Sequence, residues 1–230
     1  MRQLRTSAII LRRIEYGEAD RILTLITPDA GKLSLMAKGV RRAKSKLAGG
    51  IELFSTSEIT YMPGRGSVGT LVSARLQKHY GDITKDIDRT MLGYELIKLL
   101  DKVTEDEPEA EYYTLLEGAF EALNDATIPI DLVRLWFSAQ LLRQAGYTPN
   151  LQTTPDGKKL TPDARYEFDY DATAFRPNEE GSFGVNEIKF LRLLYSGNTP
   201  AILAQVADAP RLVHVAAPLT QSLRQYNLHT

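Results

Sequence analysis

The clearest chemical signal in this sequence is a cluster of cations, five in nine positions, between Lys38 and Lys46. No aspartate or glutamate occurs anywhere from Ala30 to Gly50. Guanidinium and ammonium groups gathered without carboxylates favour binding to a polyanion, most often to the phosphates of a nucleic acid. A merely solubilising surface is the alternative, and the local, one-signed excess of charge favours the binding interpretation over it.

Charge is also divided unevenly along the chain. Residues 1–80 contain 14 lysines and arginines against 6 acidic residues, whereas residues 81–230 contain 14 against 23, although the net charge is only -1. This division predicts two domains with different roles, a basic one at residues 1–80 and a second one at residues 81–230.

The segments that must position the cations are predicted to be short β-strands joined by turns. Five such strands in about 80 residues, with one basic face, favour a small closed barrel, and the five-stranded OB-fold is the leading interpretation. An SH3-like barrel fits the same spacing. The expected strands span Ser7–Ile14, Asp20–Thr27, Lys32–Lys38, Ile51–Met62 and Val68–Leu76.

In such a barrel, the end of the first strand, the third strand and the loop after it would lie close together. Their cations, with one more at the tip of a hairpin, are the predicted contacts to nucleic-acid phosphates: Arg12, Arg13, Lys32, Lys38, Arg41, Arg42, Lys44, Lys46 and Arg65. Four aromatic residues are candidate platforms for base stacking, although each one by itself fits a core position more readily. They are Tyr16, Phe54, Tyr61 and Tyr80.

Patterns typical of catalysis or cofactor binding do not occur in the sequence. The run Gly64–Gly69 matches G-x-G-x-x-G, but a strand follows it where a dinucleotide site needs a helix, so we interpret it as a hairpin whose glycines tolerate positive φ. The three histidines are scattered, cysteine is absent, and no zinc-protease, serine-hydrolase or P-loop motif is present. We therefore expect no enzymatic activity, no metal and no cofactor.

From Ile83 onward the hydrophobic spacing becomes helical, which makes the expected fold class α+β: a barrel followed by an all-α domain with an irregular insertion. Residues 147–184 are the least regular stretch, and Pro218 is expected to interrupt any helix in the tail. On the helix expected at residues 130–145, Arg134 and Arg143 are candidate sites for a partner's carboxylate, although surface solvation explains each more simply.

The N-terminal pattern resembles the RecO DNA repair family. The resemblance rests on Thr6–Arg13, Tyr16–Leu25, Gly31–Lys32 and Ala37–Ser45, and continues at Gly146–Leu151. It implies an OB-fold, a helical domain and recombination mediation: binding of single- and double-stranded DNA, annealing of strands, and help in loading recombinase. The implied partners are RecR and the C-terminal tail of single-stranded DNA-binding protein. The implied location is the cytoplasm, in association with the nucleoid, and it fits the absence of a signal-peptide core and of a membrane-spanning run.

One departure from that family concerns a metal. Many members carry a four-cysteine zinc site after the segment that Gly146–Leu151 resembles, but this chain has no cysteine, which rules out such a knuckle here. We expect the segment to be held by packing instead, through Tyr166, Phe168, Tyr170, Phe175 and Phe183. Two other functional classes stay open on the residues alone: an adaptor whose barrel binds an acidic protein, and, more distantly, a nuclease.

Overall fold

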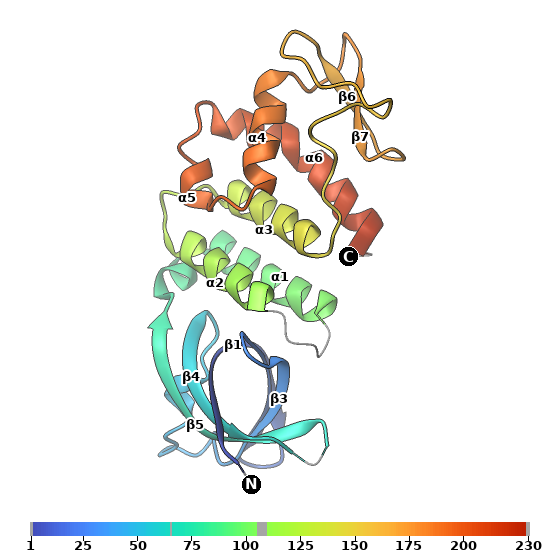
Figure 1. The fold of residues 1–230 in the computed structure, drawn as a ribbon. Helices are drawn as coiled ribbons and strands as arrows, with labels where there is room; N and C mark the ends of the chain where they lie inside the picture. Colours follow the sequence, from blue (N-terminus) through green and yellow to red (C-terminus); the bar gives the residue numbers. More distant parts are fainter. Residues whose placement is uncertain (1, 65, 105–109, 229–230) are drawn as a thin grey trace. The chain divides into compact units, whose positions relative to one another are not determined.

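The N-terminal part of the chain is a closed five-stranded barrel with strand order β1-β2-β3-β5-β4, in which β4 pairs back onto β1 (Figure 1). The computed structural model describes residues 2–64, 66–104 and 110–228. All pairs are antiparallel except β3 with β5, which is parallel. This arrangement is that of an OB-fold and confirms the predicted fold class. The strands span Leu4–Tyr16 (β1), Asp20–Thr27 (β2), Gly31–Ala37 (β3), Ser55–Met62 (β4) and Val68–His79 (β5).

The barrel closes around aliphatic side chains that alternate with outward-facing residues along each strand. In the register of the sheet, Leu23 of β2 lies opposite Leu35 of β3, and both are buried in the core together with Leu71 of β5. Because successive side chains of a strand point to opposite faces, their neighbours Ile22 and Met36 face outward. The apolar residues of these strands thus divide between the barrel core and its outer face.

The fourth strand begins later than the sequence predicts. Residues 51–54 are not part of β4, which starts at Ser55, and a short 3₁₀ turn, η1 (Ala48–Gly50), precedes them. Phe54 has a φ of 52°, outside the extended region, so it cannot continue a strand. The β-branched and apolar residues before it instead pack as part of the connection between β3 and β4.

The glycine-rich segment 63–67 connects β4 to β5 as a hairpin, as predicted, but the physical reason differs. Neither Gly64 nor Gly69 has a positive φ. A Cβ at Gly64 would overlap the Val68 carbonyl oxygen, and one at Gly69 would lie 2.7 Å from that of Met62. Close backbone approach, rather than a left-handed conformation, therefore requires glycine at these two positions.

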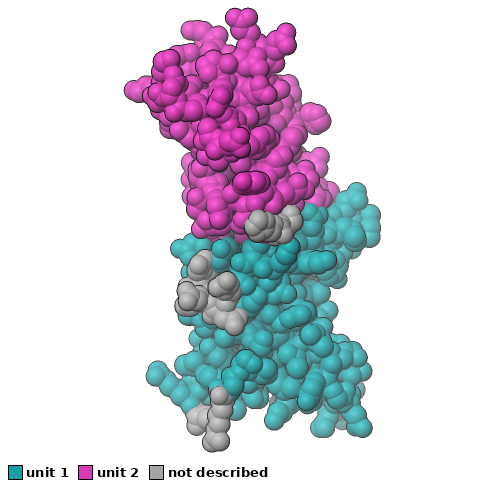
Figure 2. All heavy atoms as spheres, turned by 90° about the vertical axis from the view of Figure 1, so that its right-hand side faces the viewer, with its two compact units in different colours: residues 1–125 teal, residues 126–230 magenta. Residues whose placement is uncertain are grey.

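Two helices pack with the barrel in one compact unit, residues 1–125 (Figure 2). They are α1 (Ile87–Val103), which follows the short turn η2 (Gly81–Lys85), and α2 (Ala110–Asn124). The ring of Phe54 makes edge contacts with Tyr94 of α1 and Phe120 of α2, at centroid distances of 5.1 and 5.5 Å. Aromatic packing thus joins the barrel to its two helices. The domain boundary after residue 80 stays a prediction.

The second unit, residues 126–230, is built around α3 (Ile130–Gln144), with α4 (Val185–Tyr195), α5 (Pro200–Leu203) and α6 (Ala209–Leu228). The prediction that Pro218 interrupts the tail was wrong, because α6 runs through it. Pro218 cannot donate a hydrogen bond to the carbonyl of His214, but both residues are exposed, so water can satisfy that carbonyl. No helix in the described ranges is both long and apolar enough to span a membrane.

The stretch predicted to be irregular contains a small two-stranded sheet, β6 (Tyr166–Asp169) and β7 (Ala174–Pro177). Phe168 contacts Tyr170 and Phe175, and Phe175 contacts Phe183, each at a centroid distance of 5.1 Å. Tyr166 is also buried, and its hydroxyl accepts a hydrogen bond from the Thr161 N–H. The prediction that aromatic packing holds this segment is confirmed.

We predict that Gly50→Ala lowers the free energy of unfolding by about 1–3 kcal/mol, because an added methyl group overpacks a tight contact. Its Cβ would lie 2.6 Å from the backbone carbonyl carbon of Ala74 in β5, which cannot move aside as a side chain tip can. Urea unfolding followed by circular dichroism measures the change. Gly49→Ala is the matched control, since a Cβ there meets nothing within 4 Å. Equal midpoints for the two variants would contradict the prediction.

Candidate nucleic-acid interface

The cationic run 38–46, called the basic loop below, is fixed to the turn between β1 and β2 by its backbone. The Gly39 N–H donates to Asp20 Oδ1 at 2.6 Å, and the Arg41 N–H donates to the Ala19 carbonyl at 2.9 Å. Gly39 has a φ of 64°, a left-handed conformation that glycine adopts without strain. The loop therefore has a defined path whose anchors are main-chain groups.

Four cations at or beyond the end of β3 have exposed side chains: Lys38, Arg42, Lys44 and Lys46. Within the described part of the chain, none of them forms a salt bridge. Arg41 differs, because its Nη2 lies 3.3 Å from Glu15 Oε2, and its side chain is only 34% exposed. The basic loop thus presents four cations outward and directs one to a carboxylate.

The two arginines of β1 have different surroundings. Arg13 donates from Nη1 to the Ile51 carbonyl at 3.3 Å and to Glu52 Oε2 at 3.1 Å, so it fastens β1 to the connection before β4. Arg12 faces outward with 57% of its side chain exposed and lies 4.0 Å from Asp101 Oδ2. A pair that long and that exposed contributes little to stability, which leaves the Arg12 guanidinium accessible to a phosphate.

Lys32 caps a helix in this structure. Its Nζ donates to the carbonyls of Asp101 and Thr104 at 2.8 and 2.9 Å, and lies 3.3 Å from Asp101 Oδ1. These groups belong to the C-terminal end of α1, where carbonyls lack partners and a positive charge is favourable. The side chain is only 18% exposed. The partners of Lys32 are therefore internal, which the sequence did not indicate.

Arg65 and Arg75 are the next two cations along the chain after the basic loop. Arg65, predicted at the tip of the β4–β5 hairpin, lies outside the described residues. Arg75 of β5 is exposed and was missed by the sequence reasoning, although its outward position follows from strand alternation. It follows Ala74, the residue against which Gly50 packs, so it lies on the strand that supports the end of the β3–β4 connection.

The four aromatic candidates separate clearly by burial. Phe54, Tyr61 and Tyr80 are 2%, 5% and 0% exposed, so their rings belong to the core and not to a surface. Burial accordingly raises the pKa of the Tyr61 and Tyr80 hydroxyls. Tyr16, at the end of β1, is 55% exposed and lies beside the turn that holds the basic loop.

The two arginines predicted to receive a partner's carboxylate do not converge. Arg134 and Arg143 are both exposed on α3, but nine residues separate them, which is two and a half helical turns, so they project to opposite sides. The guanidinium of Arg143 lies against the turn after α4, where a Cβ added to Gly197 would lie 3.1 Å from Nη1. A single site that uses both cations is therefore not formed.

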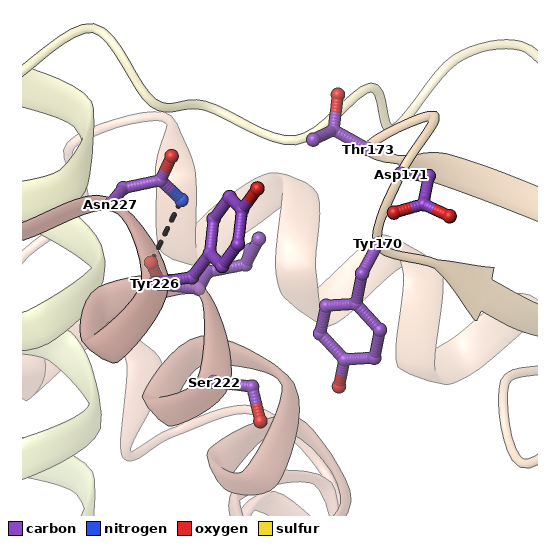
Figure 3. A pocket seen from close by; sticks show the side chains of 7 residues that line it. Tyr170, Asp171, Thr173, Ser222, Tyr226 and Asn227 are labelled. Atoms are coloured by element: carbon purple, nitrogen blue, oxygen red, sulfur yellow. Dashed lines mark hydrogen bonds between the residues drawn. The ribbon is translucent and has the colours of Figure 1, made fainter.

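A pocket of about 290 Å³ occurs elsewhere in the second unit, between α6 and the turn that joins β6 to β7. Tyr226 and Tyr170 face each other across it (Figure 3). Asp171 is the one charged residue among those that line it, so the pocket differs in chemistry from the cationic site that the sequence suggested. It is lined by Tyr170, Asp171, Thr173, Ser222, Leu223, Tyr226 and Asn227.

No cluster of three or more histidine, aspartate or glutamate residues suited to a metal occurs among the described residues.

The first unit contains a closed barrel with outward-facing cations on a loop whose backbone is anchored. The barrel and this loop define an OB-fold protein whose exposed site is cationic.

The chain belongs to the RecO family. The family described as "Recombination protein O N terminal" matches residues 1–80, and that described as "Recombination protein O C terminal" matches residues 84–214. Among curated proteins, it is 30% identical to a DNA repair protein RecO of Heliobacterium modesticaldum, over 97% of this chain and 85% of the relative. It is likewise 30% identical to a RecO of Dehalococcoides mccartyi over 86% and 80% of the two chains. A RecO of Roseiflexus is 36% identical over 65% and 52%.

We predict that Lys32→Met destabilises the protein by about 1.5–3 kcal/mol, because hydrogen bonds from a charged donor to the end of α1 are lost. Urea unfolding measures this change. Lys38→Met, at an exposed position after the same strand, should change stability by no more than about 0.5 kcal/mol. If the two variants unfold at the same urea concentration, Lys32 does not stabilise the helix end.

Proposed function

We propose that this protein is a DNA repair protein that acts as a recombination mediator. It binds single- and double-stranded DNA through the basic surface of its OB-fold, anneals complementary strands and assists recombinase loading. Membership of the RecO family and the names of its curated relatives support the repair role. DNA binding, strand annealing and recombinase loading are proposed in addition to this role.

The observation that carries the proposal is the state of the four outward cations, Lys38, Arg42, Lys44 and Lys46. They are exposed, they form no salt bridge within the described residues, and their loop is anchored by its own N–H groups, which donate to the Asp20 carboxylate and the Ala19 carbonyl. A polyanion would therefore meet fixed positive charges without first displacing internal carboxylates. Contacts of this kind bind the backbone of a nucleic acid and carry little information about base sequence.

Annealing follows from the same electrostatics. Two complementary strands repel each other through their phosphates, and cations that neutralise phosphates of both strands lower this repulsion. Annealing by this route needs neither a catalytic residue nor a cofactor. Its partners are DNA, a RecR-like protein and the C-terminal tail of single-stranded DNA-binding protein, and its place of action is the cytoplasm, at the nucleoid. The resemblance to the RecO family is the support for these partners.

We predict that replacing Lys38, Arg42, Lys44 and Lys46 with alanine weakens binding to single-stranded DNA and flattens its salt dependence. Four phosphates neutralised on a single strand contribute a slope of roughly -2.8 in log K against log salt. Between 50 and 200 mM salt, this contribution corresponds to a change of about fifty-fold in affinity. Fluorescence anisotropy of a labelled oligonucleotide at several salt concentrations measures both quantities.

The matched control removes the same charge from elsewhere, through alanine at Lys98, Lys158, Lys159 and Lys189, which are exposed and lie outside the barrel. This control should keep the wild-type slope. An unchanged slope in the first variant would remove the basic loop from the mechanism. A wild-type protein that binds no DNA at low salt would instead favour the adaptor with an acidic protein partner.

We further predict that the four-alanine variant anneals complementary strands more slowly than wild type when both strands are coated with single-stranded DNA-binding protein. The reason is that neutralisation of both backbones depends on the same cations. Strand pairing followed by fluorescence energy transfer measures the rate, and the four-lysine control provides the reference. Equal annealing rates for the two variants would separate annealing from the basic loop.

A further inference from the structure

An apolar row crosses the outward face of the barrel next to the basic loop. In the sheet register, Ile14 of β1 lies opposite Ile22 of β2, and Ile22 lies opposite Met36 of β3. Tyr16 is two residues beyond Ile14 on β1 and therefore shares its face. We call Ile14, Tyr16, Ile22 and Met36 the outer platform. The inner neighbours of this row, Leu23 and Leu35, fill the barrel core, so the platform is not part of that core.

The outer platform is open to solvent at its two residues on β1. Ile14 is 44% exposed and Tyr16 is 55% exposed, while Ile22 and Met36, on the neighbouring strands, are partly buried. Tyr16 stands at the very end of β1, before Gly17, whose φ of 56° begins the turn to β2. An aromatic ring and an aliphatic side chain thus lie next to each other at the rim of the barrel.

Cations border the outer platform on two sides. Arg12 lies on the same face of β1, two residues before Ile14, and more than half of its side chain is exposed. Lys38, the first residue of the basic loop, follows the end of β3, and the N–H groups of Gly39 and Arg41 attach this loop to Asp20 and Ala19 beyond Tyr16.

The nearby carboxylates are already engaged. Glu15 faces Arg21 and Arg41, at 3.7 and 3.3 Å, and Asp20 accepts a hydrogen bond from the Gly39 N–H. Glu18, in the turn itself, is the exception and is exposed to solvent.

We propose that the outer platform stacks unpaired bases of single-stranded DNA, with Tyr16 as the principal contact, while Arg12 and the basic loop hold the flanking phosphates. This inference rests on the proposed function and gives it a strand preference. Charge complementarity decides the occupant, because an apolar surface bordered by cations fits a strand with apolar base faces and anionic phosphates. In a duplex the base faces are stacked on one another, so they are not available to the ring.

The test is Tyr16→Ala, measured by anisotropy on a single strand, on a duplex of the same length and on a single strand of abasic sites. Loss of one stacked base should weaken binding to the single strand roughly 5- to 140-fold. Affinities for the duplex and the abasic strand should stay at the wild-type value, and so should the slope against salt, because no charge is removed.

Two variants control this experiment. Tyr16→Phe keeps the ring and should retain wild-type binding to the single strand, which shows that stacking and not the hydroxyl is responsible. Tyr147→Ala removes a tyrosine that is 44% exposed in the second unit and should have no effect.

The outcomes separate the two proposals. Wild-type affinity of Tyr16→Ala for the single strand, or equal losses on all three ligands, would overturn the stacking role while salt-dependent binding still supports the proposed function. Absence of any DNA binding by the wild type would overturn both.

Discussion

The outward charge of this barrel depends on how the backbone of the basic loop is held. Gly39 and Arg41 use their N–H groups to attach the loop to the turn between β1 and β2, and Gly50 packs directly against Ala74 where the connection returns to the barrel. Because main-chain groups and a glycine make these attachments, most of the cationic side chains are not needed to hold the loop. The side chains of Arg13 and Lys32, by contrast, donate hydrogen bonds to backbone carbonyls of neighbouring segments.

Five short strand segments separated by turn residues were enough to predict a small closed barrel, and the structure fills it with side chains such as Leu23 and Leu35. Two features could not be predicted in this way. The first is the start of β4, where Phe54 has a positive φ and its ring contacts Tyr94 and Phe120 on helices that are distant in sequence. The second is the helix through Pro218, where water can satisfy the His214 carbonyl that lacks a backbone donor because both residues are exposed.

The candidate site shows the same division between local and tertiary information. The sequence located the cations, but it could not show that Lys32 meets a helix end 69 residues later, because only the folded chain brings these groups together. It also offered four aromatic residues of equal standing, and burial alone distinguishes Tyr16 from the other three. Residue type and spacing thus predict which chemistry is available, whereas folding decides which side chains remain available for a ligand.

The aromatic packing around β6 and β7 has a consequence for the conditions that the protein tolerates. Phe168, Phe175 and Phe183 stabilise this small sheet in a chain without any cysteine. A knuckle held by thiolates loses its shape when a chelator removes the ion or when oxidants attack sulfur. Here the same stretch is held by ring contacts together with the β6–β7 backbone pairing and the Arg176–Asp169 ion pair, so its shape depends neither on a zinc ion nor on cysteine thiolates.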